Sequence, residues 1–353
     1  MRWDDLRLDD DAPQTGACDA ALSPALFAQG AVTRRFEAPQ FRGMTFYEVR
    51  AKSIINRVPD ASRMPFRWTV NPYRGCSHAC VYCFARSTHA YLDLDPGRGF
   101  DSEVVVKVNA AELLRSELAR PRWTGEHVAM GTNVDCYQRA EGRYRLMPGI
   151  IAALRDAANP FSILTKGSLV LRDLPLLAEA AGVTDVHVNV SVGFVGDDAL
   201  WRSLEPGTPS PQRRLEACHA LNEAGVPCGV LMAPIVPGLT DAPEQLEATV
   251  RAIAGAGATA VTPLVLHLRP GAREWFGEWL AANRPGLLPR YRELYGRGSY
   301  APAAYQDEVT ALVRRFAADH GLAGRPAARS RGALRPRPTR ATVAELQPAL
   351  PFE

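Results

Sequence analysis

Residues 71–86 read Asn71-Pro-Tyr-Arg-Gly-Cys76-Ser-His-Ala-Cys80-Val-Tyr-Cys83-Phe-Ala-Arg86, with three cysteines spaced C-x3-C-x2-C. A proline and a glycine precede the first cysteine, so a short loop can wrap all three sulfur atoms around one centre. Thiolates are ligands of soft centres, which here means zinc or an iron–sulfur cluster. We therefore expect the chain to be organised around a metal centre held by Cys76, Cys80 and Cys83.

The number of cysteines separates the two kinds of centre. A closed structural zinc site takes four ligands, usually from paired C-x2-C segments, and this chain has no second pair. A zinc loop would need His78 or His89 as its fourth ligand, and that alternative stays open at this point. A cubane held by three cysteines instead leaves its fourth iron free of protein ligands, where chemistry can occur. We favour the cluster, because the other cysteines are isolated in the sequence: Cys18, Cys136, Cys218 and Cys228.

Length and composition limit the class of protein. The chain has 353 residues, 46% of them apolar, which is enough for one large domain or two. A net charge of +3 predicts no nucleic-acid binding by itself. Seven cysteines, an odd number with three together, do not suit a secreted disulfide framework. The acidic N-terminus has no apolar signal region and no run of 18 apolar residues occurs, so we expect a cytoplasmic protein with no membrane partner.

Apolar runs of strand length alternate with helical patterns from Trp68 onward. The strand candidates are residues 67–70, 104–108, 127–130, 161–165, 186–192, 229–233 and 260–268. The helical candidates between them are residues 110–118, 148–157, 174–181, 211–224 and 243–254. Continuous apolar strands separated by helices are typical of parallel βαβ units. The pattern predicts an α/β fold, a partial (β/α)6-type TIM barrel over residues 67–270.

The segments outside the barrel differ in composition. Residues 1–66 predict an N-terminal arm and barrel cover, and residues 271–321, with aromatic residues at helical spacing, predict a C-terminal helical layer. Residues 322–353 carry six arginines among proline and alanine, so we expect a disordered basic tail. At its end, Gln347, Leu350 and Phe352 resemble the Q-x-x-L-x-F peptide with which bacterial proteins bind the replication sliding clamp, a candidate partner.

Polar residues follow several of the predicted strands, at the end where barrel enzymes collect their functional groups. The third candidate strand leads to Asp135 and Cys136, the fourth to Lys166, and the fifth to Ser191. These exits alternate hydrogen-bond donors and acceptors, an arrangement that can hold an amino-acid zwitterion and a ribose.

Other polar residues are expected to be structural. Glu205 and Arg214 are predicted to pair and hold a loop onto its helix. His187 and His267 lie inside apolar strands, so we expect core or rim histidines rather than ligands.

Four signatures occur in one order along the chain. They are Ala51-Lys52-Ser53-Ile54, the cysteine stretch 71–86, Thr165-Lys166, and Leu204-Glu205-Pro206-Gly207-Thr208. With Tyr82 directly before the last cysteine, this set resembles the spore photoproduct lyase-like branch of the radical S-adenosylmethionine (radical SAM) superfamily, whose members are often labelled DNA repair photolyase-related. The resemblance implies the partial barrel, a [4Fe–4S] cluster and SAM.

The resemblance also implies a reaction. In that superfamily the amine and carboxylate of SAM chelate the open iron, and the reduced cluster passes one electron to the sulfonium. The S–C5′ bond then breaks, and a 5′-deoxyadenosyl radical takes a hydrogen atom from the substrate. An external one-electron donor of flavodoxin or ferredoxin type is implied as a partner. The cofactors carry this chemistry, while the protein orients them and excludes water.

Carried over residue by residue, the motif assigns a role to each strand exit. The three cysteines would bind the cluster, and Tyr82 would lie against the adenine of SAM. Lys166 would pair with the SAM carboxylate, and Ser191 would contact the ribose or the methionyl part. Asp135 is the candidate for the SAM amine, because this branch lacks the usual Gly-Gly-Glu motif and uses the third strand exit.

Cys136 departs from the branch pattern, which commonly reads Thr-Asp-Pro-Tyr-Gln where this chain has Val134-Asp135-Cys136-Tyr137-Gln138. A spore photoproduct lyase uses a cysteine near this exit to return a hydrogen atom to its product radical, and the weak S–H bond suits that task. In that enzyme the cysteine lies a few positions earlier, near Thr132 here. A free cysteine is commonly a small buried residue, so two interpretations of Cys136 stand, catalytic hydrogen donor and core residue.

The sequence thus predicts a radical SAM enzyme that abstracts hydrogen from an unidentified substrate. The branch and the basic tail favour nucleic acid, in a DNA repair-like role. A peptide or a small metabolite is the alternative substrate class. A non-catalytic iron–sulfur or zinc regulatory protein is the alternative from another functional class.

Overall fold

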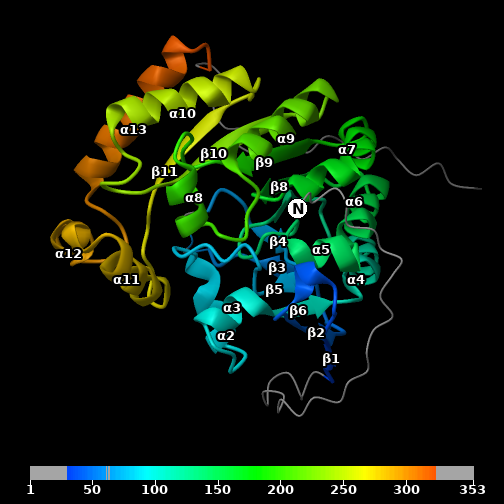
Figure 1. Cartoon of the computed structure of the whole chain (residues 1–353). Coiled ribbons are helices and arrows are strands. Elements are labelled where there is room, and N and C mark those ends of the chain that lie inside the picture. Colours follow the sequence, from blue (N-terminus) through cyan, green and yellow to red (C-terminus); the bar gives the residue numbers. More distant parts are fainter. Residues whose placement is uncertain (1–29, 61, 63, 323–353) are drawn as a thin grey trace, which may run out of the picture.

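The computed structural model describes residues 30–60, 62 and 64–322 (Figure 1). Several predictions fall outside these residues. They concern Cys18 and most of the N-terminal arm, the basic tail from residue 323, and the clamp-like peptide at Gln347, Leu350 and Phe352.

The main sheet of the described chain contains six parallel strands and one antiparallel edge strand, in the order β11-β10-β9-β8-β7-β4-β3. Its strands are β3 (Ile55–Arg57), β4 (Trp68–Val70), β7 (Val128–Met130), β8 (Phe161–Thr165), β9 (Val186–Ser191), β10 (Cys228–Ile235) and β11 (Val261–Val265). Neighbouring strands pair their apolar residues in register, as with Ile163 opposite Val188, and both of these side chains are fully buried. The predicted α/β fold with a parallel sheet is confirmed.

Helices connect the parallel strands and cover the outer face of the sheet (Figure 1). They are α4 (Ala110–Leu118), α5 (Arg139–Tyr144), α6 (Leu146–Asp156), α7 (Leu174–Ala181), α8 (Asp198–Leu204), α9 (Pro211–Glu223) and α10 (Pro243–Gly255). Leu114, Leu154 and Leu177 of α4, α6 and α7 are fully buried in the main core. Burying a leucine contributes about 1.5–3 kcal/mol, so this apolar face holds each helix on the sheet.

Local signals set the start of the helices that follow β9. The Asp197 side chain accepts a hydrogen bond from Leu200 N at 2.9 Å and caps α8. Ser210 caps α9 by accepting from Arg213 N at 3.2 Å, and Pro211 occupies the first turn, where its missing N–H costs nothing. The segment between these helices is therefore fixed at both ends.

A second, smaller sheet has the order β1-β2-β6-β5 and its own aromatic core. Its strands are β1 (Val32–Arg34), β2 (Thr45–Val49), β5 (Tyr73–Arg74) and β6 (Glu103–Lys107). The sequence places residues 104–108 among the barrel strands, but β6 pairs with β2 and β5 instead. Val104 and Val106 are buried with Phe46 and Phe100, and Val105 packs on the other face with Tyr47, so none of the three joins the barrel core. An apolar run shows that a strand is buried, and only tertiary contacts decide in which sheet.

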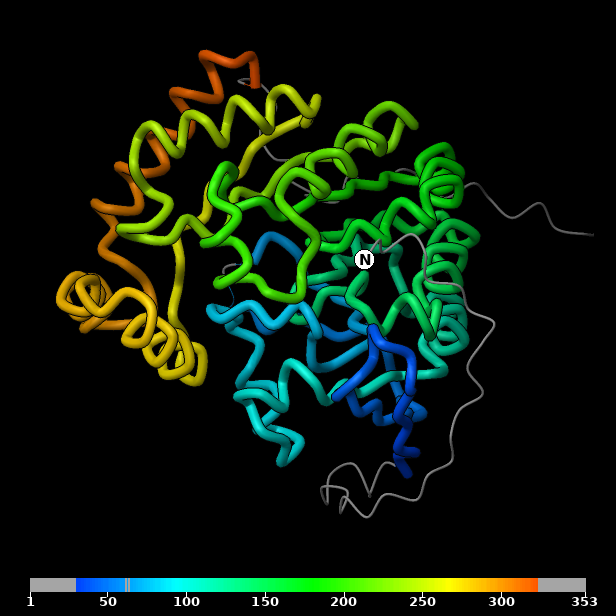
Figure 2. The backbone as a smooth tube through the Cα atoms, viewed as in Figure 1, coloured from blue at the N-terminus to red at the C-terminus, as the bar shows by residue number. Residues whose placement is uncertain are grey.

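The C-terminal part of the described chain is helical, with α11 (Ala272–Asn283), α12 (Leu288–Tyr295) and α13 (Ala303–Asp319). Helix α13 packs on α10 and β11, and α11 contacts the turn that follows the cysteines. Short helical turns complete the chain: α2 (Ser87–Ala90), α3 (Arg98–Ser102), η2 (Pro39–Phe41), η3 (Phe84–Arg86), η4 (Ser168–Asp173) and η5 (Pro285–Leu287). Figure 2 shows the cyan segment after β4 running between the blue N-terminal sheet and the orange C-terminal helices. Among the described helices, none has the length and apolar character needed to cross a membrane.

Candidate functional site

The cysteine loop, residues 76–83, follows β5 at the junction of the two sheets. Cys76 N donates to Phe100 O at 2.9 Å, and Cys83 N donates to Cys80 O at 3.2 Å, so the loop turns back on itself. Gly75 has a φ of +85°, and a Cβ there would collide with Glu103 O, so only glycine fits at the entrance.

The three thiols of the loop are free, with Cys76 and Cys80 buried and Cys83 partly exposed. Burial raises the pKa of all three thiols, because a thiolate is costly in an apolar environment. Metal ligation supplies the compensating positive charge and displaces the protons. Three free thiols in one buried loop fit a soft iron–sulfur centre.

The two histidines proposed as zinc ligands have other partners. His78 Nδ1 lies 3.3 Å from Asp135 Oδ2, and His89 Nε2 lies 2.8 Å from Glu103 O. Within residues 30–60, 62 and 64–322, no three His, Cys, Asp or Glu side chains converge closely enough to hold a single metal ion. Each histidine therefore has one ring nitrogen engaged elsewhere, and His89 Nδ1 is buried without a hydrogen-bond partner.

Gln138, at the start of α5, binds the entrance of the cysteine loop. Its fully buried side chain accepts from Ser77 N at 2.9 Å and donates to Gly75 O at 2.7 Å. Ser77 Oγ in turn accepts from Arg139 N at 3.1 Å. Residues that follow β7 therefore hold the cysteine loop through both side-chain and backbone hydrogen bonds.

Arg86 supports the other end of the loop. Its guanidinium is fully buried, donates to Cys80 O at 3.1 Å, and pairs with Asp101 at 2.8 Å. It also stacks over Trp275 of α11, 4.7 Å from the ring centre. Through these contacts the buried arginine ties the cysteine turn to α3 and to the C-terminal helices, while its Nε is buried without a hydrogen-bond partner.

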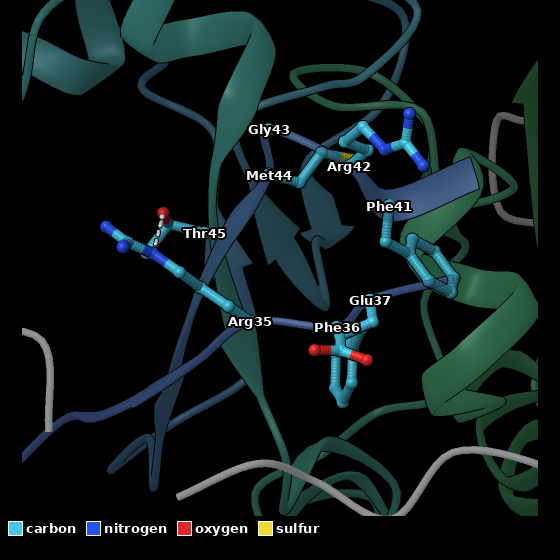
Figure 3. Close-up of a pocket in the computed structure, with 8 residues that line it drawn as sticks. All are labelled: Arg35, Phe36, Glu37, Phe41, Arg42, Gly43, Met44 and Thr45. Carbon is cyan, nitrogen blue, oxygen red and sulfur yellow. Dashed lines mark hydrogen bonds between the residues drawn. The ribbon is translucent and has the colours of Figure 1, made fainter. Parts of the chain in front are cut away.

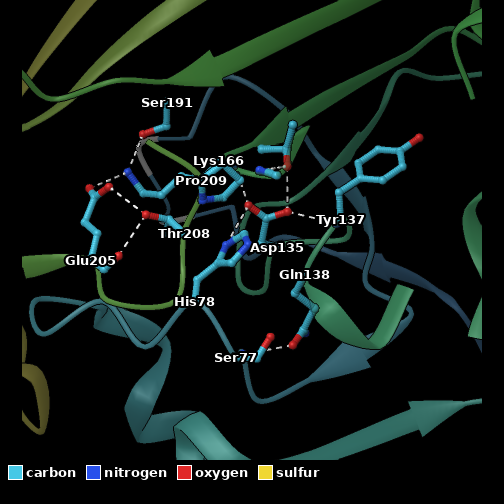
Figure 4. Close-up of polar contacts among 12 residues, drawn as sticks. Ser77, His78, Asp135, Tyr137, Gln138, Lys166, Ser191, Glu205, Thr208 and Pro209 are labelled. Atoms are coloured by element: carbon cyan, nitrogen blue, oxygen red, sulfur yellow. Dashed lines mark hydrogen bonds and ion pairs between the residues drawn. The ribbon is translucent and has the colours of Figure 1, made fainter. Parts of the chain in front are cut away.

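Lys166 lies between Ser191 and Glu205 (Figure 4), and Tyr82, which the family resemblance also assigns to SAM, contacts the same Glu205. Lys166 Nζ lies 2.8 Å from Ser191 Oγ and 3.0 Å from Glu205 Oε1, and it is 5.8 Å from the Tyr82 ring centre. The Tyr82 hydroxyl donates to the same Glu205 oxygen. The structure thus brings together residues that lie in four separate segments of the sequence.

Glu205 is paired by two cations, Lys166 and Arg214. Burial alone would raise the pKa of Glu205, but the charges of Arg214 and Lys166 outweigh it and lower the pKa to about 2. Two cations thus face one carboxylate in this group, and the buried Asp135 carboxylate beside it supplies a second negative charge. The predicted Glu205–Arg214 pair is present, and it has a third partner that the sequence did not indicate.

Asp135 lies beside this group with every acceptor position of its carboxylate in use. Oδ1 accepts from Tyr137 N at 2.8 Å and Thr165 Oγ1 at 2.7 Å, while Oδ2 accepts from Lys166 N at 2.6 Å and contacts His78. Burial raises the pKa of Asp135, but the His78 charge and these hydrogen bonds outweigh it, so the pKa lies below its usual range. Asp135 therefore connects the exits of β7 and β8 to the cysteine loop.

Cys136 points into the protein core. Its side chain is fully buried in the main apolar cluster beside Tyr137. At the same strand exit, the Thr132 hydroxyl is buried without a hydrogen-bond partner.

Sequence reasoning missed the supporting roles of Gln138, His78 and Arg86. His78 and Arg86 lie in the cysteine stretch, and Gln138 lies in the stretch that contains Asp135 and Cys136. Their position next to the candidate site residues in the sequence was the signal that could have identified them. Of the two histidines expected at core or rim positions, His187 pairs with Asp185 at 3.1 Å, and His267 stacks on Tyr300 and packs on Phe84, the neighbour of Cys83.

A separate hollow of about 700 Å³ lies in the small sheet (Figure 3). Its lining residues are Arg35, Phe36, Glu37, Phe41, Arg42, Gly43, Met44 and Thr45. Figure 3 shows Arg35 and Arg42 pointing in opposite directions, so their charges do not converge on one ligand. None of the residues assigned to SAM or the cluster lines this hollow.

Comparison with known proteins decides the family. The family model of the radical SAM superfamily matches residues 70–253, more than half of the chain. This chain belongs to the radical SAM superfamily. Radical SAM enzymes use a [4Fe–4S] cluster and SAM, so the predicted cofactors and the predicted enzyme class are confirmed.

Relatives of this radical SAM protein align with more than half of its length. Uncharacterized proteins of Mycobacterium bovis and Mycobacterium tuberculosis are 56% identical over 311 residues, covering 88% of this chain and 91% of theirs. An uncharacterized protein of Methanocaldococcus jannaschii is 30% identical over 196 residues, 55% of this chain and 69% of its own.

Solved structures with a similar fold are those of spore photoproduct lyase. A cysteine-to-serine mutant of that enzyme has a TM-score of 0.60 and 17% identity, covering 78% of this chain and 79% of its own. A mutant with bound AdoMet and dinucleoside spore photoproduct has a TM-score of 0.59 and 17% identity, covering 77% and 78%. The fold expected from the sequence resemblance is therefore confirmed.

Proposed function

We propose that Cys76, Cys80 and Cys83 hold the [4Fe–4S] cluster and that SAM binds beside it at Lys166. The observation that carries this proposal is the Lys166 ammonium, which Ser191 and Glu205 hold 5.8 Å from the ring centre of Tyr82 in the cysteine loop. When bound, the reduced cluster and SAM supply a 5′-deoxyadenosyl radical for hydrogen abstraction. The protein's own part is to orient SAM and keep water out.

Each SAM-binding residue has a role that its surroundings support. Lys166 would bind the SAM carboxylate by exchanging its longest hydrogen bond, 3.3 Å to Ala233 O, while Glu205 and Ser191 keep it in place and Tyr82 lies nearby. Asp135 is assigned to the SAM amine, and the amine would have to displace one of its four present donors. The His78 contact, at 3.3 Å, is the longest of these.

The cluster assignment is tested by anaerobic reconstitution with iron and sulfide, followed by a dithionite assay for 5′-deoxyadenosine. Wild type is expected to cleave SAM, and the C76A, C80A and C83A variants are expected to lose both iron and cleavage. The control is C218A, because Cys218 is buried in α9, outside the loop. A cluster that forms in wild type without cleaving SAM would favour the regulatory alternative, and zinc in place of iron would refute the proposal.

We propose nucleic acid as the substrate class, with a peptide or a small metabolite as the alternatives. A structure of similar fold is described as holding dinucleoside spore photoproduct, which suggests the class. An aromatic stack supports it: exposed Tyr300 stacks on His267 at 5.5 Å, and His267 packs on Phe84, the neighbour of Cys83. The Arg269 guanidinium lies over Phe84. Exposed aromatic rings next to arginine are a common surface for stacking bases.

Cys136 remains a proposed hydrogen-atom donor. The C136A variant is expected to cleave SAM at the wild-type rate and to lose only the quenching of the product radical. Because the thiol is fully buried, substrate would have to reach it through movement of the β7 exit. Unchanged product formation in C136A would leave Cys136 as a core residue.

Two partners are also proposed. A flavodoxin- or ferredoxin-type protein would supply the electron, and the peptide containing Gln347, Leu350 and Phe352 would bind the sliding clamp. A pull-down in which deleting residues 347–353 leaves clamp binding unchanged would refute the second.

A further inference from the structure

The 204–208 loop, Leu204-Glu205-Pro206-Gly207-Thr208, lies directly against the cysteine loop. Val81 N donates to Leu204 O at 3.0 Å, and Gly207 N donates to His78 O at 3.0 Å. His78 lies between the first two cysteines and Val81 between the last two. Both spacers of the C-x3-C-x2-C motif are therefore held by backbone hydrogen bonds from one distant loop.

Gly207 allows this close approach. A Cβ at this position would overlap the Ser77 carbonyl oxygen and come within 2.9 Å of His78 Cα. Both obstacles are backbone atoms, which cannot rotate away as a flexible side chain would. Any side chain at Gly207 would therefore push the two loops apart.

Arg214 fixes the 204–208 loop to the barrel. Its buried guanidinium donates to Pro209 O and Ser191 O at 2.9 Å each, to Thr208 Oγ1 at 2.7 Å, and to Glu205. The loop is thus anchored to the end of β9 and to α9, and it is not a free surface segment.

Glu205 joins this anchor to the proposed SAM subsite and to the cysteine loop. One carboxylate is shared by Arg214 of the anchor, Lys166 of the SAM subsite and Tyr82 of the cysteine loop. A change at any of these partners is expected to affect the other two, because all three bind one buried carboxylate.

We propose that the 204–208 loop is a clamp that holds the cysteine loop in its cluster-binding geometry, with Gly207 setting the distance. Glu205 is the positioning residue that links this clamp to Lys166, so that SAM binding and cluster geometry depend on each other. This inference rests on the proposed function, since it takes Cys76, Cys80 and Cys83 as cluster ligands and Lys166 as a SAM ligand.

The clamp is tested with G207A against G255A. Gly255 ends α10, and a Cβ there meets nothing within 4 Å, so G255A adds the same methyl group harmlessly. After anaerobic reconstitution, G207A is expected to hold at least threefold less iron per chain than G255A. Far-UV circular dichroism of both apo proteins should match wild type, which separates a displaced loop from an unfolded chain. Equal iron content in the two variants would overturn the clamp.

The link through Glu205 is tested with E205Q and E205D. E205Q is expected to keep iron within twofold of wild type, to bind SAM at least tenfold more weakly, and to lose the SAM-induced change in the EPR spectrum of the reduced cluster. E205D, which restores the charge, should recover part of that spectral change. The control is E216Q, because Glu216 is exposed on α9 and pairs only with Arg213 at the surface. If Glu205 merely competed with SAM for Lys166, E205Q would bind SAM more tightly, and that result would overturn the link.

The experiments distinguish a failure of the proposed function from a failure of the clamp alone. A wild-type chain that takes up no iron–sulfur cluster would overturn the proposed function and the clamp with it. A wild-type chain that loads a cluster and binds SAM, while G207A and E205Q behave identically to it, would overturn the clamp alone.

Discussion

The position of the Lys166 side chain is fixed by three hydrogen-bond acceptors around its ammonium group. Its ammonium is held by Ser191, Glu205 and the Ala233 carbonyl, with 13% of the side chain exposed. All three N–H donors of the ammonium are in use, so a SAM carboxylate would have to replace one acceptor, of which Ala233 O at 3.3 Å is the most distant.

Replacing Lys166 with Met should therefore weaken SAM binding. A charge-assisted hydrogen bond is worth about 1.5–3 kcal/mol, so the Kd should rise by about 10- to 100-fold. Isothermal titration with the reconstituted protein measures this. K52M serves as control, because Lys52 is an exposed lysine, and its SAM affinity should stay within about twofold. Equal losses in both variants would contradict the role of Lys166.

Lys107 offers a test of pH dependence away from SAM. Burial lowers the pKa of Lys107 to about 8, while its ammonium donates to Asn71 O at 2.8 Å, just before the cysteine stretch. Between pH 8 and 10.5 the unfolded chain holds more protons than the folded one, so stability should rise with pH by about 3 kcal/mol from this group. The unfolding free energy from urea titrations measures it. The difference between wild type and K107M should change across this pH window, and a difference independent of pH would contradict the prediction.

At the scale of elements, α9 both covers the sheet and supplies a side chain to the candidate site. Its Arg214 side chain is 1% exposed and reaches the end of β9 and the 204–208 loop. Capping by Ser210 fixes where this helix starts, and thereby where Arg214 lies.

Replacing Arg214 with Met should destabilise the apo protein by about 3–5 kcal/mol, since it leaves the buried Glu205 carboxylate with one cation fewer. The neighbouring Arg213 provides a matched control, because it is half exposed and pairs only with Glu216 at 3.1 Å. R213M should change stability by less than about 1 kcal/mol. Urea unfolding of both variants makes the comparison, and similar losses would show that the buried network adds no stability.

At the scale of the whole molecule, the cysteine loop lies where three parts of the chain meet. The small sheet supplies β5 and β6, the barrel supplies Gln138 and the 204–208 loop, and α11 supplies Trp275 against Arg86. The bridge between His267 and Tyr300 continues this junction to the surface. A large substrate would therefore approach the cluster along the aromatic stack.

This geometry predicts that Y300A weakens binding of single-stranded DNA. Stacking contributes about 1–3 kcal/mol per base, so the Kd should rise by about 5- to 100-fold. Y91A is the control: Tyr91 is 80% exposed, and its ring faces Arg74, apart from the stack. Fluorescence anisotropy with a labelled oligonucleotide gives the answer. Equal affinities for Y300A and Y91A would favour the peptide or small-metabolite alternatives.

Much of the fold could be predicted because its signals are local. The apolar periodicity located helices at residues 110–118 and 174–181 and a strand at 161–165, with the bounds that the structure has. Helix caps and apolar faces depend on neighbours within a few residues, so a sequence displays them directly. The cysteine spacing likewise indicates the kind of metal centre, because the number and separation of the thiols are local properties of one short stretch.

The sequence by itself determined the parallel sheet and the cysteine loop, while the residues proposed for SAM came from the family resemblance. Only the tertiary structure decided that β6 belongs to the small sheet, that the Asp135 carboxylate is fully engaged, and that Glu205 joins Lys166, Tyr82 and Arg214. The physical reason is separation along the chain. Tyr82 and Glu205 are 123 residues apart, and no local pattern encodes a hydrogen bond between side chains that the folded core alone brings together.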